Sequence, residues 1–269
     1  MRFAGKEPSS DSLLLVVEAG NTTTSFVVFQ EHESLDIVKV SSKILSDSDG
    51  FSATLEQIII KYPSLCDAAI CSVVPLLERT IGDYLRHHLI GQVMTVSALI
   101  NLPFVLDYAS PESFGADRIA LCAMSQLLYP EEAVIAIDIG TAITVDVLGS
   151  NQHYLGGLIM PGLDLMAKAL HEHTARLPLV ALGCPDTLLG SSTVDGIKNG
   201  IIHGCVSSMD GLVTKITRWL HDERSESAIR VIMTGGNAPL IAGMLDCSPM
   251  LDELAVVKGT RYLFSLNAD

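Results

Sequence analysis

The stretch VVEAGNTTTSFVVF, residues 16–29, places a short polar segment between two apolar runs. The apolar runs are rich in Val and Phe, which favour β-strands, and the Gly-Asn step between them is typical of a tight hairpin turn. A second stretch, VIAIDIGTAITVDVL at residues 134–148, repeats the pattern with Asp138 where the first has Glu18. The two stretches predict two related hairpins, each with a carboxylate just before its turn glycine.

Apolar periodicity beyond each hairpin predicts further strands and helices in the same alternation. In the first half, strands are expected at 13–17, 26–29, 35–41, 68–75 and 93–98, and helices at 51–62, 76–89 and 115–129. In the second half, a strand pair is expected over 133–148, with strands at 154–162 and 229–236, helices at 163–177 and 238–245, one long helix or two over 192–222, and a final strand and helix. This order is that of an α/β protein with mixed sheets flanked by helices.

The repeat predicts two domains that arose by internal duplication. We expect an N-terminal domain over residues 13–130 and a C-terminal domain over residues 131–269, with the active cleft between them. Residues 1–12 are polar and contain Pro and Ser, which indicates a flexible N-terminal extension.

Composition excludes several classes of function. With 48% hydrophobic and 18% charged residues the chain is expected to be compact. A net charge of −14 argues against a nucleic-acid surface, although a glycine turn or helix N-terminus can bind a nucleotide phosphate locally. No apolar run approaches the roughly 20 residues that span a bilayer, so no membrane partner is expected. The six cysteines form no CxxC pair, which favours reduced thiols in the cytoplasm.

The two hairpin turns have the chemistry of a phosphate site. Each offers a carboxylate, a glycine that permits close backbone approach, and neighbouring hydroxyl groups. Two such turns predict a polyphosphate held by backbone N–H groups, with the carboxylates holding its cation. A third turn, Thr234 to Asn237, joins a strand to a helix and suits part of a nucleotide. The alternative is that these glycines only form hairpins and that Asp117 is an ordinary first-turn acid of a helix.

The motifs, in order, resemble those of the type III pantothenate kinases, a family of the acetate-kinase, sugar-kinase, chaperone-ATPase and actin superfamily. The resemblance runs from residue 13 to about residue 264 and rests on Glu18-Ala-Gly-Asn-Thr22, Ser72-Val-Val-Pro75, Gly115-Ala-Asp-Arg118, Asp138-x-Gly-Thr-Ala-x-Thr-x-Asp146, Gly156-Gly-x-Ile-x-Pro-Gly162, Thr174-Ala-x-Leu-Pro178, Gly190-x-x-Thr193 and Thr234-Gly-Gly236. It implies two ribonuclease-H-like (actin-like) domains and ATP-dependent phosphorylation of pantothenate in coenzyme A biosynthesis.

The resemblance also implies residue roles. ATP would be bound by Glu18, Ala19, Gly20, Asn21, Thr22, Thr23, Thr24, Ser25 and Thr141. Pantothenate would be bound by Tyr108, Gly115, Ala116, Asp117, Arg118 and Thr193, with Asp117 as the general base and Arg118 stabilising the transferring phosphoryl group. Asp138 would hold a monovalent cation, K⁺ or NH₄⁺, and Mg²⁺ would accompany ATP. The family implies a homodimer with the substrate site at the subunit interface.

One residue departs from the family pattern, because Glu18 stands where the family has aspartate. The extra methylene predicts either a working or weakened kinase or, as the alternative, a homologue that serves as a binding or accessory regulatory protein. A phosphatase or a small-sugar kinase of the same superfamily is less favoured, since those lack the Gly-Ala-Asp-Arg element. Asp146 has no assigned role; it would share a strand face with Asp138 if no bulge intervenes.

Overall fold

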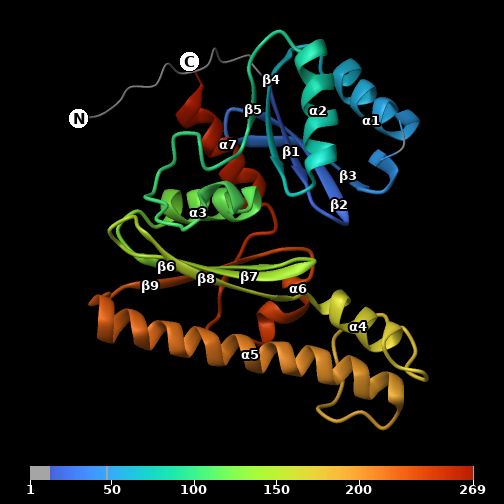
Figure 1. Cartoon of the computed structure of the whole chain (residues 1–269), viewed down its shortest axis with the longest axis vertical. Coiled ribbons are helices and arrows are strands. Elements are labelled where there is room, and N and C mark those ends of the chain that lie inside the picture. Colours follow the sequence, from blue (N-terminus) through green and yellow to red (C-terminus); the bar gives the residue numbers. More distant parts are fainter. Residues whose placement is uncertain (1–12, 47, 269) are drawn as a thin grey trace. The chain divides into compact units, whose positions relative to one another are not determined.

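The computed structural model describes residues 13–46 and 48–268, so the predicted N-terminal extension lies outside the described part (Figure 1). The chain forms two compact units, one running to Leu127 and resuming at Ala255, the other spanning Leu128–Leu254. Each unit contains a five-stranded mixed sheet with helices packed on it. This confirms the predicted α/β class.

The first unit has the strand order β3-β2-β1-β4-β5. Its strands are β1 (Leu13–Ala19), β2 (Thr23–Gln30), β3 (Glu33–Ser41), β4 (Leu65–Ser72) and β5 (Val93–Thr95), the first three antiparallel and the last two added in parallel. Its helices are η1 (Ile44–Ser46), α1 (Ser48–Lys61), α2 (Pro75–His88), η2 (Pro111–Ser113), α3 (Ala116–Leu128) and α7 (Ala255–Asn267). Apolar residues of α1 and α2 pack with alternate residues of β1, such as Leu15 and Val17, to form the core.

The second unit repeats this plan with the order β10-β9-β6-β7-β8. Its strands are β6 (Ala133–Ile139), β7 (Ala142–Leu148), β8 (Tyr154–Pro161), β9 (Ile229–Thr234) and β10 (Met250–Leu251). Its helices are α4 (Leu163–Glu172), α5 (Thr193–Arg224), α6 (Ala238–Ile241) and η3 (Ala242–Met244). In both units an antiparallel hairpin is extended by a third antiparallel strand on one side and by parallel strands on the other. The shared topology agrees with the repeat in the sequence.

The segment predicted as one long helix or two is a single helix of 32 residues, α5, which runs along the sheet of its own unit (Figure 1). Its start is fixed by Ser192, whose hydroxyl accepts a hydrogen bond from the N–H of Asp195 at 3.1 Å. Its end is fixed by Ser225, which adopts the left-handed conformation with φ of 58°. The buried side of α5 carries residues such as Ile201 and Met209 and closes the second core.

Several boundaries differ from those expected. The helix predicted over 163–177 ends at Glu172, where the Thr174 hydroxyl donates to the carbonyl of Leu170 and turns the chain away. The strand predicted over 93–98 ends at Thr95, and the helix over 238–245 divides into α6 and η3. The larger difference concerns α7. It was expected in the C-terminal domain, but it belongs to the first unit, where it packs on β1 and β4.

Close packing within the first unit explains the position of α7. A Cβ placed on Gly259 would overlap the carbonyl oxygen of Ala120 in α3, so the two helices touch backbone to backbone at this point. Only glycine permits such an approach without displacement.

Across residues 13–46 and 48–268, no helix has the length and apolar character needed to cross a membrane.

Candidate active site

The turn between β1 and β2 is closed by its own backbone and held from outside by Ser42. The N–H of Gly20 donates to the carbonyl of Thr23 at 3.0 Å. The hydroxyl of Ser42 donates to the carbonyl of Gly20 at 2.6 Å, and its N–H donates to the carbonyl of Thr22 at 3.0 Å. Three bonds therefore hold the turn in one conformation. Nothing in the sequence marked Ser42 for this role.

The Ser72-Val-Val-Pro75 motif supports the same turn from β4. The N–H of Val73 donates to the carbonyl of Ala19 at 3.1 Å, at the last residue of β1. The Ser72 hydroxyl accepts the N–H of Val74 at 3.1 Å where α2 begins with Pro75. The motif thus braces the end of the strand that carries Glu18.

The residues expected to bind ATP differ in accessibility. Asn21, Thr22 and Thr23 are exposed, and Glu18 and Gly20 are partly exposed. Ala19, Thr24 and Ser25 are buried, and the Thr24 hydroxyl shares a 2.9 Å hydrogen bond with that of Ser42. The exposed tip can meet a ligand directly, whereas the buried members shape the turn.

Glu18 has an unusual electrostatic setting. Burial raises the pKa of its carboxyl from 4.5 to about 7, while the positive charge of Lys39 lowers it and the negative charge of Asp117 raises it. Asp117 is far from Glu18 in sequence, yet its charge acts on Glu18 within the first unit. The carboxylate of the first turn and the expected general base therefore interact electrostatically within one unit.

The start of α3 holds the residues expected to bind pantothenate. Gly115 leaves room for the Asp117 side chain, because a Cβ at Gly115 would lie 2.5 Å from Asp117 Oδ1. That same oxygen accepts the N–H of Arg118 at 2.8 Å. The Arg118 guanidinium lies 4.3 Å from the centre of the Phe114 ring, a cation–π distance.

An aromatic pair continues this cluster. The ring of Tyr108 meets that of Phe114 edge to face, with 4.9 Å between their centres. Tyr108 is partly exposed and Phe114 is buried, so Phe114 anchors both Tyr108 and Arg118. The residues expected from Tyr108 to Arg118 therefore form one continuous cluster. Phe114 was not among them, although an aromatic residue just before Gly115 was a signal that could have found it.

In the second unit, Asp138 occupies the position equivalent to Glu18, at the end of β6. A Cβ on Gly235 would overlap Asp138 Oδ1, and one on Gly140 would lie 3.3 Å from the same atom. Asp138 pairs with Thr144 across the hairpin and with Thr234 on the other side. Oxygen donors thus gather around Asp138, and Thr141 is exposed at the tip of the turn.

The third turn meets the second at this point. The N–H of Asn237 donates to the carbonyl of Ile139 at 3.0 Å, and its side-chain amide donates to Asp164 at 3.0 Å. Gly162 packs equally closely, because a Cβ there would overlap the carbonyl oxygens of Gly140 and Thr141. The turn that carries Thr141 is therefore packed against the Gly235–Asn237 turn and against Gly162. Asp164 accepts a hydrogen bond from Asn237 at this site, and the sequence analysis did not single it out.

Asp146 lies on the same face of β7 as Thr144, without a bulge between them, and therefore on the face that carries Asp138. It is fully buried and accepts a hydrogen bond from the Tyr154 hydroxyl at 2.9 Å. Its role is that of a buried partner of Tyr154 rather than an exposed ligand.

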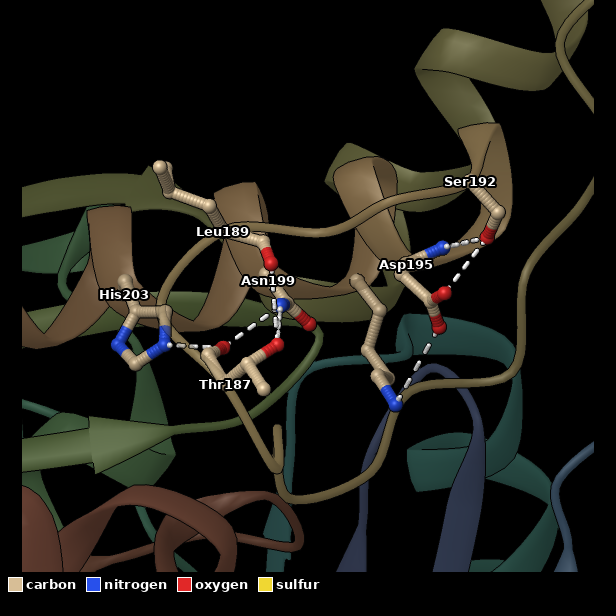
Figure 2. A network of polar contacts seen from close by, with 7 residues as sticks. Thr187, Leu189, Ser192, Asp195, Asn199 and His203 are labelled. Carbon is tan, nitrogen blue, oxygen red and sulfur yellow. Dashed lines mark hydrogen bonds and ion pairs between the residues drawn. The ribbon is translucent and has the colours of Figure 1, made fainter.

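Thr193, the last expected pantothenate residue, is exposed at the first position of α5. Figure 2 shows how the preceding loop is held: Asn199 and His203 of α5 both point to Thr187. The Asn199 amide donates to the carbonyl of Thr187 at 2.7 Å, and His203 Nε2 lies 3.4 Å from the same oxygen. The loop is therefore anchored five residues before Ser192 caps the helix.

Thr193 also lines an apolar groove between α4 and α5 with a volume of about 870 Å³. Gly196, Gly200 and Gly204 line it at four-residue spacing, with Met166 and Leu170 among the residues from α4.

Neither unit, in its described residues, gathers three or more His, Cys, Asp or Glu side chains in a metal-binding group.

Comparison with known proteins shows which family the chain resembles. Residues 14–215 match the family model for type III pantothenate kinases. A type III pantothenate kinase of Chlorobium luteolum is 48% identical over 258 residues, covering 96% of this chain and 96% of that protein.

Solved structures share the fold. A protein from Campylobacter jejuni, described as of a Baf family of transcriptional activators, has a TM-score of 0.57 at 20% identity and covers 94% of this chain and 98% of that one. A Listeria monocytogenes protein described as a candidate N-acetylmannosamine kinase has a TM-score of 0.53 at 12% identity, with the same coverage. These likenesses support the fold alone, which is two mixed five-stranded sheets flanked by helices.

Proposed function

The chain belongs to the type III pantothenate kinase family, and from this premise we propose that it transfers the γ-phosphoryl group of ATP to the hydroxyl of pantothenate, the first step of coenzyme A biosynthesis. The product is 4′-phosphopantothenate. The observation that supports the proposal is that Glu18, in the first hairpin, and Asp117, in the first turn of α3, belong to the same unit and interact electrostatically.

Asp117 is the proposed general base. Its carboxylate is partly exposed at the first turn of α3, where Gly115 makes room for it. It would accept the proton of the pantothenate hydroxyl as that oxygen attacks the γ-phosphorus, and ADP would leave with the bridging oxygen. Phosphoryl transfer depends mostly on positioning and on neutralising charge, and a well-placed base adds a factor of about 100 or more.

We propose that ATP is bound by the turn from Glu18 to Ser25 and by Thr141. The exposed tip, Asn21 to Thr23, would meet the phosphates, and the buried Thr24 and Ser25 would keep the turn in shape. Mg²⁺ with ATP would neutralise phosphate charge, and the carboxylate of Glu18 is an oxygen ligand of the kind it prefers. Asp138, with Thr144 beside it, offers oxygen donors that fit the proposed K⁺ or NH₄⁺ site.

Pantothenate would be bound by Tyr108, Gly115 to Arg118, and Thr193. In the first unit the aromatic pair and the fixed Arg118 form a preorganised surface for a small polar substrate. We further propose a homodimer with the substrate site at the subunit interface. The apolar groove beside Thr193 supports this, because an exposed apolar surface of this kind is typical of an interface.

We place the enzyme in the cytoplasm. The six cysteines, all in the described part of the chain, form no disulfide bond, and Cys205 is among those that are buried. Reduced thiols of this kind are the norm where glutathione and thioredoxin keep cysteines reduced.

The deciding experiment incubates the purified protein with ATP, Mg²⁺ and pantothenate, with and without K⁺, and measures phosphopantothenate by mass spectrometry. We expect product that increases with K⁺ and is absent without pantothenate. No product at any K⁺ or NH₄⁺ concentration would refute the proposal.

The alternative of an accessory regulatory protein is not favoured, because a kinase relative matches across 96% of the chain. A Glu18→Asp variant tests the effect of the extra methylene. We expect a change in kcat of less than about tenfold if the braced turn has adapted to glutamate. A gain of about 100-fold would show that glutamate impairs the site.

A further inference from the structure

The nucleotide site in the first unit concentrates negative charge. Glu18 and Asp117 already act on each other, and the phosphates of ATP would add several further charges. Such a site needs a cation supplied by the protein as well as the ion that accompanies ATP. None of the residues expected from the motifs on the first turn is basic.

The sheet register supplies a candidate. Glu18 of β1 lies opposite Ser25 of β2, and Ser25 lies opposite Lys39 of β3. Directly opposite residues in antiparallel strands point to the same face, so these three side chains form a row across the sheet. Two strand spacings separate the backbones of Lys39 and Glu18 by about 10 Å. An extended lysine side chain spans much of that distance.

Two other basic side chains of the first unit already have partners. Arg118 lies over the Phe114 ring. Lys61 of α1 pairs with Asp36 at 2.6 Å, and Asp36 lies on the opposite face of β3 from Lys39 because the two are an odd number of residues apart. Lys39 is exposed, and it is the basic side chain whose charge acts on Glu18.

We propose that Lys39 binds the phosphates of the nucleotide held at the turn from Glu18 to Ser25, and is thus a further ATP-binding residue, contributed by the third strand of the sheet. Its ammonium group would offset the charge of Glu18 in the free protein and contact phosphate oxygens when ATP is present. Ser25, which lies between them in the register, has a small side chain. This inference rests on the proposed function, because it requires ATP at this turn.

The test compares Lys39→Met, Lys39→Arg and a control, Lys43→Met. Lys43 is exposed and lies four positions further along the chain, so the control changes net charge equally at a neighbouring site. Binding of the Mg²⁺ complex of a non-hydrolysable ATP analogue is measured by calorimetry, and the KM values for ATP and pantothenate are measured by product formation. Circular dichroism checks that each variant is folded.

We expect Lys39→Met to weaken analogue binding and raise the KM for ATP by about tenfold, the usual effect of losing one charge-assisted contact. The KM for pantothenate should change by less than about twofold, Lys39→Arg should restore most of the affinity, and Lys43→Met should behave as wild type. A purely structural role would not separate the two KM values in this way.

The inference is overturned if Lys39→Met binds the analogue as tightly as wild type, or if Lys43→Met weakens binding equally. Failure of the proposed function looks different. In that case the wild-type protein makes no phosphopantothenate, and weaker analogue binding by Lys39→Met would still support the inference. If the wild type does not bind the analogue at all, both proposals fall.

Discussion

Gly235 and Asp138 are packed so closely that a single methyl group on the glycine would overlap a carboxylate oxygen of the aspartate. Gly235 also has a φ of +100°, a conformation that residues with a side chain rarely adopt. The third turn therefore lies directly against the proposed cation site of the second unit. Steric exclusion and backbone conformation both require glycine there.

Gly235→Ala should destabilise the protein by about 2–4 kcal/mol, since the new Cβ would also lie 2.6 Å from the backbone of Ile139. Thermal or urea unfolding measures the change. Gly236→Ala is the matched control, because no atom lies within 4 Å of a Cβ at that position. Equal losses in the two variants would contradict the packing argument.

Glu18→Gln should make the protein more stable at alkaline pH. The pKa of Glu18 is raised from 4.5 to about 7, so the folded state favours the protonated form. That contribution to stability is fully present below pH 4.5 and is lost as pH rises through about 7. Glutamine retains it, so the free energy of unfolding should exceed that of wild type by up to about 3 kcal/mol at pH 8 and by little at pH 5.

Urea unfolding at the two pH values tests this, with Glu131→Gln, an exposed glutamate, as the control. Kinase activity should fall in Glu18→Gln, because the neutral amide does not replace a carboxylate beside Mg²⁺ and phosphate. A stability difference that is the same at pH 5 and pH 8 would show that ionisation of Glu18 is not its cause.

Asp117→Asn should lower kcat by about 100-fold or more while the protein still binds ATP. The asparagine retains the size of the side chain beside Gly115 but cannot accept the proton. Removal of the negative charge near Glu18 should leave nucleotide affinity equal or higher, which calorimetry can measure. Asp107→Asn, an exposed aspartate on the segment before α3, should retain wild-type activity.

Asn199→Leu should raise the KM for pantothenate more than it changes the KM for ATP. Without the amide donor, the carbonyl of Thr187 loses its 2.7 Å hydrogen bond, and the loop that leads into Thr193 is less firmly held. The expected cost in stability is about 1–3 kcal/mol. His203→Ala, which removes only a 3.4 Å contact to the same oxygen, should have a smaller effect on both quantities.

The sequence predicted best those parts of the molecule that depend on local pattern. The hairpins around Gly20 and Gly140 and the order of the strands follow from alternating apolar residues and from turn chemistry, and the duplicated sheets confirm them. The expected residues from Tyr108 to Arg118 form one cluster, because they are close in the chain and one short helix, α3, orients most of them.

What the sequence could not show depends on tertiary contacts. Ser42 reaches the Gly20 turn because β3 pairs with β2 in one register, and Lys39 joins the row of Glu18 for the same reason. The assignment of α7 depends on its packing against β1, which no local pattern reveals. The pKa of Glu18 likewise results from burial and from charges contributed by other elements.

The return of α7 to the first unit has a consequence for the order in which the protein is made. Residues 128–254 are contiguous, so the second unit can complete its sheet while the ribosome is still adding the residues that follow. The first unit begins earlier but lacks the helix that packs on β1 and β4 until Ala255–Asn267 has emerged. During synthesis, the part of the protein translated first is therefore the part finished last.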